Sequence, residues 1–132
     1  VGMFAFLLWD THTRELVAVR DRFGVKPVTY HADGEGRLAI ASEIAPLFAA
    51  GVLQRPDETT WATYLATGAQ DQGERTFWDG VRTLAPGHLL RWRPGRAPVV
   101  VRWYDLADRV GDAVDTRSQG EVEAEYVALL DE

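Results

Sequence analysis

The longest apolar run in this chain, residues 3–9, is only as long as a β-strand. A membrane-spanning helix needs about 20 apolar residues, so the sequence predicts no spanning segment. The run ends in a polar turn cluster at residues 10–13, and a second run follows at residues 16–22 with Val17 and Val19 as β-branched residues. The two runs therefore predict an antiparallel hairpin that is buried on at least one face.

Two further hairpins are predicted where apolar runs flank a turn. Glycines in residues 32–36 suit a tight turn, because glycine readily takes the positive φ that such turns demand. The dipeptide Pro94-Gly95 supplies the other turn. The predicted strands are residues 27–31 with 38–41, and residues 88–92 with 99–104.

Three segments change to the spacing that is typical of helices. Ser42 is expected to cap the first helix and Gly51 to end it, whereas Asp57 begins the second and Gly68 ends it. The third segment, residues 121–132, repeats apolar residues at intervals of three and four and must dock outside this chain or fold back. Its apolar residues are Val122, Tyr126, Leu129 and Leu130.

Composition excludes several classes of function. The chain has 132 residues, 46% hydrophobic and 26% charged, which suits one soluble globular domain. It has no cysteine, which excludes disulfides, thiolate metal sites and a cysteine nucleophile within this stretch. A net charge of −6 argues against binding to nucleic acid or to anionic membranes. His12, His31 and His88 are scattered along the chain, so no metal site is expected.

The densest charged cluster in apolar surroundings is RDRFGVKP, at residues 20–27. Strand alternation places Arg20 and Asp21 on opposite faces, so at least one charge points toward a buried layer and must be paired there. The functional interpretation is a wall of an active site or of an interdomain interface. The structural interpretation, which the residues alone favour, is an ion-pair network at the end of a strand. Glu43 is a candidate partner of Arg20 or Arg22, or a carboxylate favoured in the first turn of a helix.

Two patterns that suggest chemistry have better structural explanations. Ser42 lies between a predicted strand and helix, as serine nucleophiles can, but its neighbours are Ala41 and Glu43 rather than glycines. Capping therefore explains Ser42 better. Gly34 and Gly36 lie between two strands, so they predict a hairpin rather than a phosphate-binding loop.

Four segments, taken in order, resemble the glutamine-dependent asparagine synthetase family. They are GMFAFLLWD at residues 2–10, RDRFGVKP at 20–27, ASEI at 41–44, and LAPGH at 84–88 followed by Trp103-Tyr104. The resemblance covers nearly the whole chain with agreeing spacing, and the motifs are strong together. Small departures are Thr29 where the family usually has tyrosine, Ala85 for proline, and Ala45-Pro46 where Lys-Ala is common.

This resemblance implies an α+β structure: part of the N-terminal-nucleophile hydrolase fold, in which antiparallel sheets are sandwiched by helices, with the sheet incomplete in this chain. It implies the C-terminal part of a glutaminase-type (class II amidotransferase) domain at residues 1–104. Residues 105–120, which are acidic and poor in large apolar residues, are expected to be a linker. Residues 121–132 are expected to form the first helix of an ATP-dependent synthetase domain.

In that family an N-terminal cysteine hydrolyses glutamine, and ammonia passes through an internal tunnel to an aspartyl-adenylate made from aspartate and Mg-ATP. The resemblance therefore implies a cytoplasmic ligase of asparagine biosynthesis, with ATP and Mg bound by the parent enzyme and no cofactor bound by this chain. Expected partners are the upstream glutaminase half and the downstream ATP domain. Glutamine, aspartate and ATP are the parent's substrates, and a homodimer is one expected assembly.

No catalytic residue of the family falls in this chain, since position 1 is Val1 and the glutamine-binding and pyrophosphate-binding segments lie outside it. A fragment that alone neither hydrolyses glutamine nor binds ATP is expected. Met3 matches a methionine along the ammonia tunnel, where an apolar side chain suits exclusion of water. The alternative is a core methionine that fills space. Residues expected near the site or a domain interface are Arg20, Asp21, Gly24, Pro27, Ser42 and Glu43.

Two alternatives to an asparagine synthetase stay open. The same two-domain scaffold serves β-lactam synthetases and lasso-peptide cyclases, and in some such relatives the glutaminase half has lost its cysteine. A non-catalytic, β-rich interaction module is the alternative from a different class. Sheet edges left open by missing partner strands count against such a module, because unpaired edges promote aggregation.

Overall fold

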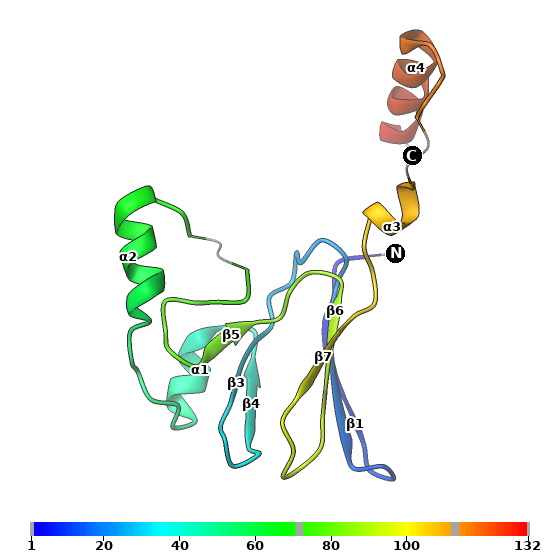
Figure 1. The fold of residues 1–132 in the computed structure, drawn as a ribbon. Helices are drawn as coiled ribbons and strands as arrows, with labels where there is room; N and C mark the ends of the chain where they lie inside the picture. Colours follow the sequence, from blue (N-terminus) through cyan, green and yellow to red (C-terminus); the bar gives the residue numbers. More distant parts are fainter. Residues whose placement is uncertain (1, 71–72, 112–113, 132) are drawn as a thin grey trace.

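The computed structural model describes residues 2–70, 73–111 and 114–131. Within these ranges the chain is an α+β structure with two antiparallel sheets and four helices (Figure 1). The strands are β1 (Ala5–Asp10), β2 (Glu15–Arg20), β3 (Thr29–Ala32), β4 (Leu38–Ala41), β5 (Val81–Thr83), β6 (His88–Trp92) and β7 (Val99–Arg102). The helices are α1 (Ile44–Ala49), α2 (Glu58–Thr67), α3 (Ala107–Val110) and α4 (Gln119–Leu130).

The first and last predicted hairpins are confirmed, and they share one four-stranded sheet. Its order is β1-β2-β6-β7, with every neighbouring pair antiparallel. Ala18 of β2 is in register with Leu7 of β1 on one side and with Leu90 of β6 on the other. The pairing of β2 with β6 therefore joins two local hairpins that are far apart in the sequence.

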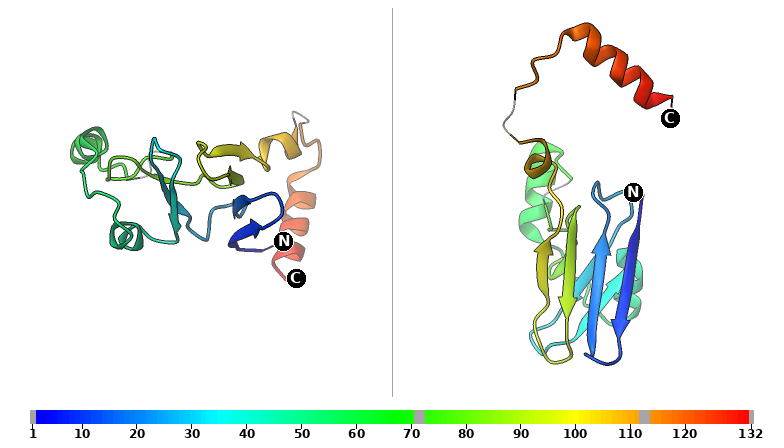
Figure 2. Two further views of the ribbon diagram at one scale, coloured as in Figure 1. Left: turned by 90° about the horizontal axis from the view of Figure 1, so that it is seen from below. Right: turned by 90° about the vertical axis from the view of Figure 1, so that its right-hand side faces the viewer.

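The middle hairpin is also confirmed and belongs to a second sheet, of order β4-β3-β5. The strand β5 was not predicted; it joins this sheet by pairing Val81 with His31 and Thr83 with Thr29. The three hairpin turns gather at one end of the molecule (Figures 1 and 2). The opposite end carries the β2–β3 loop, the turn before β6 and α3, and we call it the exit end.

The hydrophobic core lies between the two sheets. Ala18 and Leu90 of the four-stranded sheet are fully buried against Tyr30 of the three-stranded sheet. Val28 and Leu84, which flank strands of the second sheet, complete this cluster. Partly buried side chains around it are Leu38, Ile40, Trp92 and Val100. Burial of these apolar side chains from both sheets is the main force that holds the sandwich together.

The helix α1 covers the outer side of the three-stranded sheet, where it contacts β3 and β4 and buries Leu47. Its end is as predicted: Gly51 has a φ of 97° and donates its N–H to the Phe48 carbonyl, while Val52 donates to Leu47. Its predicted beginning is wrong. The N-cap is Glu43 rather than Ser42, and no side chain caps it, because the helix starts one residue later.

The helix α2 begins and ends as predicted. Asp57 is its N-cap and accepts a hydrogen bond from the Thr60 N–H at 2.9 Å, and Gly68 ends it in the left-handed conformation. Its aromatic side chains Trp61 and Tyr64 pack against Phe77, with ring centroids 4.7 and 5.2 Å apart.

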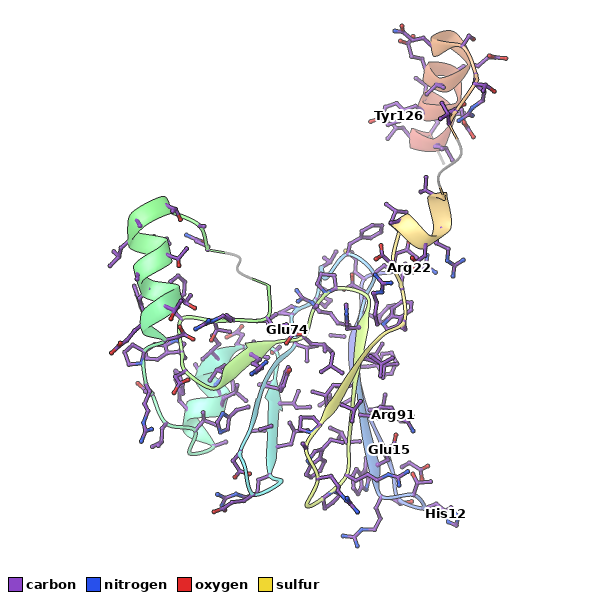
Figure 3. All side chains as sticks on the ribbon, in the orientation of Figure 1. His12, Glu15, Arg22, Glu74, Arg91 and Tyr126 are labelled. Atoms are coloured by element: carbon purple, nitrogen blue, oxygen red, sulfur yellow. The ribbon has the colours of Figure 1, made fainter. Side chains whose placement is uncertain are left out.

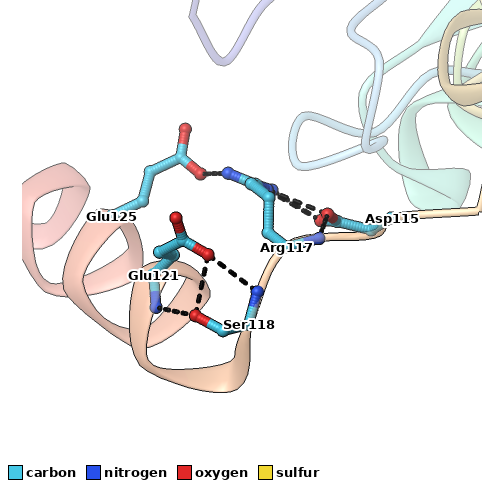
Figure 4. A network of polar contacts seen from close by, with 5 residues as sticks. All are labelled: Asp115, Arg117, Ser118, Glu121 and Glu125. Carbon is cyan, nitrogen blue, oxygen red and sulfur yellow. Dashed lines mark hydrogen bonds and ion pairs between the residues drawn. The ribbon is translucent and has the colours of Figure 1, made fainter.

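Two helices differ from the prediction that residues 105–120 form a linker. The short helix α3 lies inside that range, and α4 begins at Gln119 rather than Glu121. Ser118 and Glu121 explain the earlier start: the Ser118 N–H donates to the Glu121 carboxylate at 2.8 Å, while the Glu121 N–H donates back to Ser118 Oγ (Figure 4). All residues of α4 are exposed, and α4 lies away from both sheets (Figure 1).

The outer face of the four-stranded sheet is mostly apolar, and no described element covers it. Register places two rows of side chains there, because residues paired across antiparallel strands point the same way. We call these the outer rows: Phe6, Val19, Leu89 and Val101 in one, and Leu8, Val17, Arg91 and Val99 in the other. Every residue of β1, at the sheet edge, is exposed. Full burial of apolar side chains is therefore confined to the inner face, at Ala18 of β2 and Leu90 of β6.

Candidate functional site

The Asp21 carboxylate anchors the β2–β3 loop at the exit end. Asp21 is 1% exposed, and its Oδ1 accepts hydrogen bonds from the backbone N–H groups of Phe23 and Val25, both at 3.1 Å. Its Oδ2 accepts the Lys26 N–H at 2.9 Å. Burial raises the pKa of this carboxyl group, but the N–H donors outweigh burial and leave the pKa below its ordinary value. Asp21 therefore holds the loop as a carboxylate bound by backbone amides.

The Arg20 guanidinium holds the same loop from the side of its carbonyl groups. Nε donates to the Lys26 carbonyl at 2.9 Å, and Nη2 donates to the Gly24 carbonyl at 2.6 Å. Nη1 donates to the Leu84 carbonyl at 2.6 Å, which ties the loop to the segment that carries the LAPGH motif. Within one loop, Arg20 thus donates hydrogen bonds to carbonyl groups, and Asp21 accepts hydrogen bonds from amide groups.

The candidate ion pair of Glu43 with Arg20 or Arg22 is wrong. None of the ion pairs among the described residues includes Glu43. Backbone carbonyl groups bind the Arg20 guanidinium instead, and the Arg22 guanidinium lies 4.8 Å from the centre of the Tyr104 ring. The prediction that one charge of the pair 20–21 is buried and bonded is confirmed by Asp21, with backbone amides in the place of a cation.

Gly24 sits where no larger residue fits. Its φ is +66°, a left-handed conformation that side chains other than glycine seldom adopt. A Cβ at this position would lie 2.7 Å from Pro86 Cγ and 3.0 Å from the Arg20 guanidinium. The close packing of Gly24 against Pro86 brings the RDRFGVKP and LAPGH motifs into contact.

Three of the four motif segments also line one hollow of about 170 Å³ at the β1 side of the sandwich. Pro27 of the loop and Ser42 of the ASEI segment both contribute to its wall, so the structure brings these two predicted site residues together. The lining residues are Ala5, Phe6, Leu7, Pro27, Val28, Ile40, Ala41 and Ser42. The hollow is mostly apolar, which suits a passage or a packing surface better than acid–base chemistry.

Thr29 fixes the ASEI segment next to this hollow. Its Oγ1 donates to the carbonyl groups of Ala41, at 3.0 Å, and Glu43, at 3.1 Å. Glu43 therefore contributes its backbone here as the first residue before α1. Thr29 thereby ties β3 to the backbone that leads into α1.

Met3 lies just before β1 and is 65% exposed. The carbonyl group of the next residue, Phe4, accepts the Asp21 N–H at 2.9 Å, so Met3 is held beside the anchored loop. Within this chain Met3 is a surface residue and fills no core position.

One charged cluster was not foreseen from the sequence. Glu15 is buried on the outer side of the four-stranded sheet and forms ion pairs with Arg91 and Arg93, the latter at 2.7 Å (Figure 3). Hydrogen bonds from Arg91 and then Arg93 hold the pKa of this carboxyl group below its ordinary value. The pairing of β2 with β6 creates this cluster, and a single local motif gives no signal for it.

Neither a metal centre nor a membrane span is found in the part of the chain that the structure describes. Its histidine, aspartate and glutamate side chains form no group of three that could hold a metal ion. None of its helices is both long and apolar enough to cross a bilayer.

Comparison with known proteins gives the family. The model of a protein family described as "Glutamine amidotransferase domain" matches residues 1–104. A putative glutamine-hydrolysing asparagine synthetase of Mycobacterium tuberculosis is 40% identical over 108 residues, which are 78% of this chain and 16% of that protein. Amidase chry2 of Gibberella zeae is 34% identical over 125 residues, 92% of this chain and 17% of the amidase.

A third relative, asparagine synthetase (glutamine-hydrolysing) 3 of Bacillus subtilis, is 29% identical over 115 residues, 86% of this chain and 19% of the relative. The chain thus spans less than a fifth of the length of each of these curated relatives. The family match covers most of the chain and includes the anchored loop and both sheets. The chain therefore belongs to the glutamine amidotransferase domain family, with asparagine synthetases among its relatives.

Proposed function

We propose that this chain is the later part of a glutaminase domain, together with the start of a synthetase domain, in an enzyme that moves the amide nitrogen of glutamine to aspartate at the expense of ATP. The observation that carries the proposal is the convergence of the RDRFGVKP, ASEI and GMFAF segments on one loop and one hollow. Relatives named as glutamine-hydrolysing asparagine synthetases support it.

The proposed domain boundary lies after Tyr104. The family match ends at residue 104, and the last strand, β7, ends two residues earlier. Residues 105–120 then form the connection and residues 121–132 belong to the first synthetase helix, with α3 as an ordered part of the connection.

The N-terminal-nucleophile fold is the proposed complete architecture. In it, helices would cover the outer rows of the four-stranded sheet as α1 covers the three-stranded sheet. The exposed edge of β1 and the apolar outer rows support this, because an apolar sheet face is stable only when a second layer buries it. The upstream half of the glutaminase domain is the proposed source of that layer.

The role proposed for this chain is scaffold and conduit. The chain has no cysteine, so the glutamine-hydrolysing thiol belongs to another part of the enzyme in this proposal. ATP and Mg are proposed to bind in the downstream synthetase domain. Met3 is proposed to line the ammonia passage, and its exposed apolar side chain beside the anchored loop supports that role.

The test is a pair of assays. The full-length protein that contains this chain, given glutamine, aspartate and Mg-ATP, should form asparagine and glutamate, whereas the 132-residue chain alone should release no glutamate above the blank. Glutamate release by the chain alone would overturn the scaffold role. Absence of asparagine from the full-length protein would overturn the synthetase assignment.

A second candidate is a relative on the same scaffold with another acceptor, of the β-lactam synthetase or lasso-peptide cyclase type. Two relatives named as amidases, each 34% identical and matching 92% of this chain, support this second candidate. ATP consumption that is independent of aspartate but stimulated by a different carboxylic acid would select this candidate.

A further inference from the structure

A second hollow, of about 650 Å³, lies on the outer side of the three-stranded sheet, beside the end of α1. Three segments that are far apart in the sequence line it: the β3–β4 hairpin, the loop after α1 and the turn before β5. We call it the His31 hollow, after the histidine on its sheet wall. Binding sites for small molecules usually have volumes of about 300–1,000 Å³, so this hollow is large enough for a small ligand.

His31 lies on the outer face of β3, because its neighbour Tyr30 is buried in the core and successive residues of a strand point to opposite faces. Its Nδ1 lies 2.9 Å from the Gly80 carbonyl oxygen, and since a carbonyl only accepts, Nδ1 carries a hydrogen. Gly80 has a φ of +72°, and a Cβ there would lie 3.2 Å from the His31 ring. Among the residues that the structure describes, no hydrogen bond uses His31 Nε2. His31 is therefore fixed in the wall with one ring nitrogen left for a ligand.

Hydrogen bonds within the chain hold the walls of the hollow in place. The Asp79 N–H donates to the Arg55 carbonyl at 2.7 Å, which ties the turn before β5 to the loop after α1. In the β3–β4 hairpin, Asp33 Oδ1 accepts the Arg37 N–H at 2.8 Å. The shape of the hollow is therefore preformed, which lowers the entropic cost of binding a ligand.

Two arginines and two aspartates line the hollow, so their formal charges cancel. Arg37 and Asp33 form an ion pair with each other at 2.5 Å. Arg55 and Asp79 form no ion pair within the part of the chain that the structure describes, although their backbones are hydrogen-bonded. A cation and an anion on adjacent segments of one wall are therefore open to a ligand.

A ligand that carries one carboxylate and one ammonium group fits these charges. Its carboxylate would complement Arg55, whose planar guanidinium can donate two parallel hydrogen bonds, and its ammonium group would complement Asp79. A phosphate or a polyamine would match one of these two side chains and be repelled by the other. The wall also includes Leu38, Val52 and Leu53, and Leu53 is 63% exposed. This apolar part of the wall suits an aliphatic side chain.

We propose that the His31 hollow binds a free α-amino acid or dipeptide with aliphatic side chains, held by Arg55 at its carboxylate and by Asp79 at its ammonium group. Neutral His31 accepts a further hydrogen bond from the ammonium group at Nε2, and Leu53 contacts the aliphatic side chain. The volume of about 650 Å³ admits either ligand size. The proposal does not depend on the proposed function, because its residues all belong to this chain and none serves the scaffold and conduit role.

Isothermal titration calorimetry on the full-length protein tests the class of ligand. L-Leucine and L-leucyl-L-leucine are the probes, and at least one of them should bind with a dissociation constant below about 1 mM. N-acetylation removes the ammonium charge and C-terminal amidation removes the carboxylate, so either change should weaken binding of that probe by at least about tenfold. Binding of neither probe, or equal affinity of the blocked forms, would overturn the proposal.

Variants test whether the probe binds in the His31 hollow. Arg55→Gln and Asp79→Asn should each weaken binding by at least about tenfold, because each removes one charge and keeps a similar shape. Arg96→Gln is the matched control: it changes an exposed arginine of the β6–β7 turn, outside the hollow, and should leave the affinity unchanged.

Circular dichroism shows whether each variant keeps its fold. Unchanged affinity in either folded variant would overturn the site, and so would equal weakening in the Arg96→Gln control. If a variant does not fold, the blocked probes still test the same two charges on the unaltered protein.

Discussion

The inner and outer faces of the four-stranded sheet are both mostly apolar, yet fully buried apolar side chains are found only on the inner face. On the inner side, Ala18 and Leu90 are fully covered by the three-stranded sheet. On the outer side, Leu8 and Val99 remain more than half exposed. The three-stranded sheet, in contrast, has α1 on its outer side. The comparison shows that strand patterning specifies which faces are to be buried, whereas burial itself depends on a second layer.

The largest expected effect comes from two neighbours in β6 that point to opposite faces. Leu90→Ala should lower the free energy of unfolding by about 3 kcal/mol, because it leaves a cavity in a closed core. Leu89→Ala removes the same atoms from the uncovered outer row and should cost less than about 1 kcal/mol in this chain. Urea unfolding measures both. Equal costs would mean that the outer face is buried after all.

The covered side of the molecule is also expected to respond to pH through Asp21. Asp21→Asn keeps the shape but weakens three hydrogen bonds from backbone amides, at a cost of about 2 kcal/mol near neutral pH. The folded-state pKa is lowered, so the carboxylate stabilises the fold above the unfolded pKa of about 3.9 and loses this effect as pH falls through the folded value.

The stability difference between wild type and Asp21→Asn should therefore be constant above about pH 5 and shrink toward acid. Unfolding curves in urea at a series of pH values measure it. A difference that grows on acidification would show that Asp21 is protonated in the folded protein, against its bonding to amides.

Gly24 gives a further test of the closed region, with an effect of similar size. Gly24→Ala should destabilise by about 2 kcal/mol, because the φ of +66° and the 2.7 Å approach to Pro86 both oppose a side chain. Gly34→Ala is the matched control, since a Cβ there meets nothing within 4 Å. Thermal melting compares the two variants. Similar melting temperatures would show that the loop can move away from Pro86.

The smallest effect is expected in the open region. Ser118→Ala removes the side chain that accepts the Glu121 N–H and should cost α4 about 1 kcal/mol of local stability. Because α4 lies away from the sheets, global unfolding should stay unchanged, and only the helical signal should fall. Circular dichroism measures the loss of helical signal, which is then compared with the global unfolding transition of the same variant. A lower global stability would mean that α4 packs on the sandwich.

Local signals predicted much of this fold. Each predicted hairpin has its turn and its strands within 20 or so residues, so the pattern around Gly36 or Pro94-Gly95 was sufficient to find it. The strand β5 escaped prediction because its three residues form a strand only by pairing with β3, from a distant part of the sequence. Secondary structure that depends on a remote partner leaves little trace in its own residues.

The candidate site shows the same division. Strand alternation predicted that at least one charge of the pair 20–21 is buried, but it did not say which one. The partners of Asp21 could not be predicted either, because backbone amides look alike in every sequence. The pairing of Glu15 with Arg91 and Arg93 required the order of strands in the sheet, which no local motif contains. Ser42 missed its expected role by one residue, since several polar residues near a helix start can all satisfy a capping pattern.

The pairing of β2 with β6 has a consequence for biosynthesis. The strand β2 can pair with β6 only after residues 88–92 have been translated. The β1–β2 hairpin therefore emerges from the ribosome well before β6 exists. During that interval the margin of β2 that later pairs with β6 has unpaired backbone groups. A strand whose second neighbour is translated this late is open to non-native pairing while the rest of the chain is made.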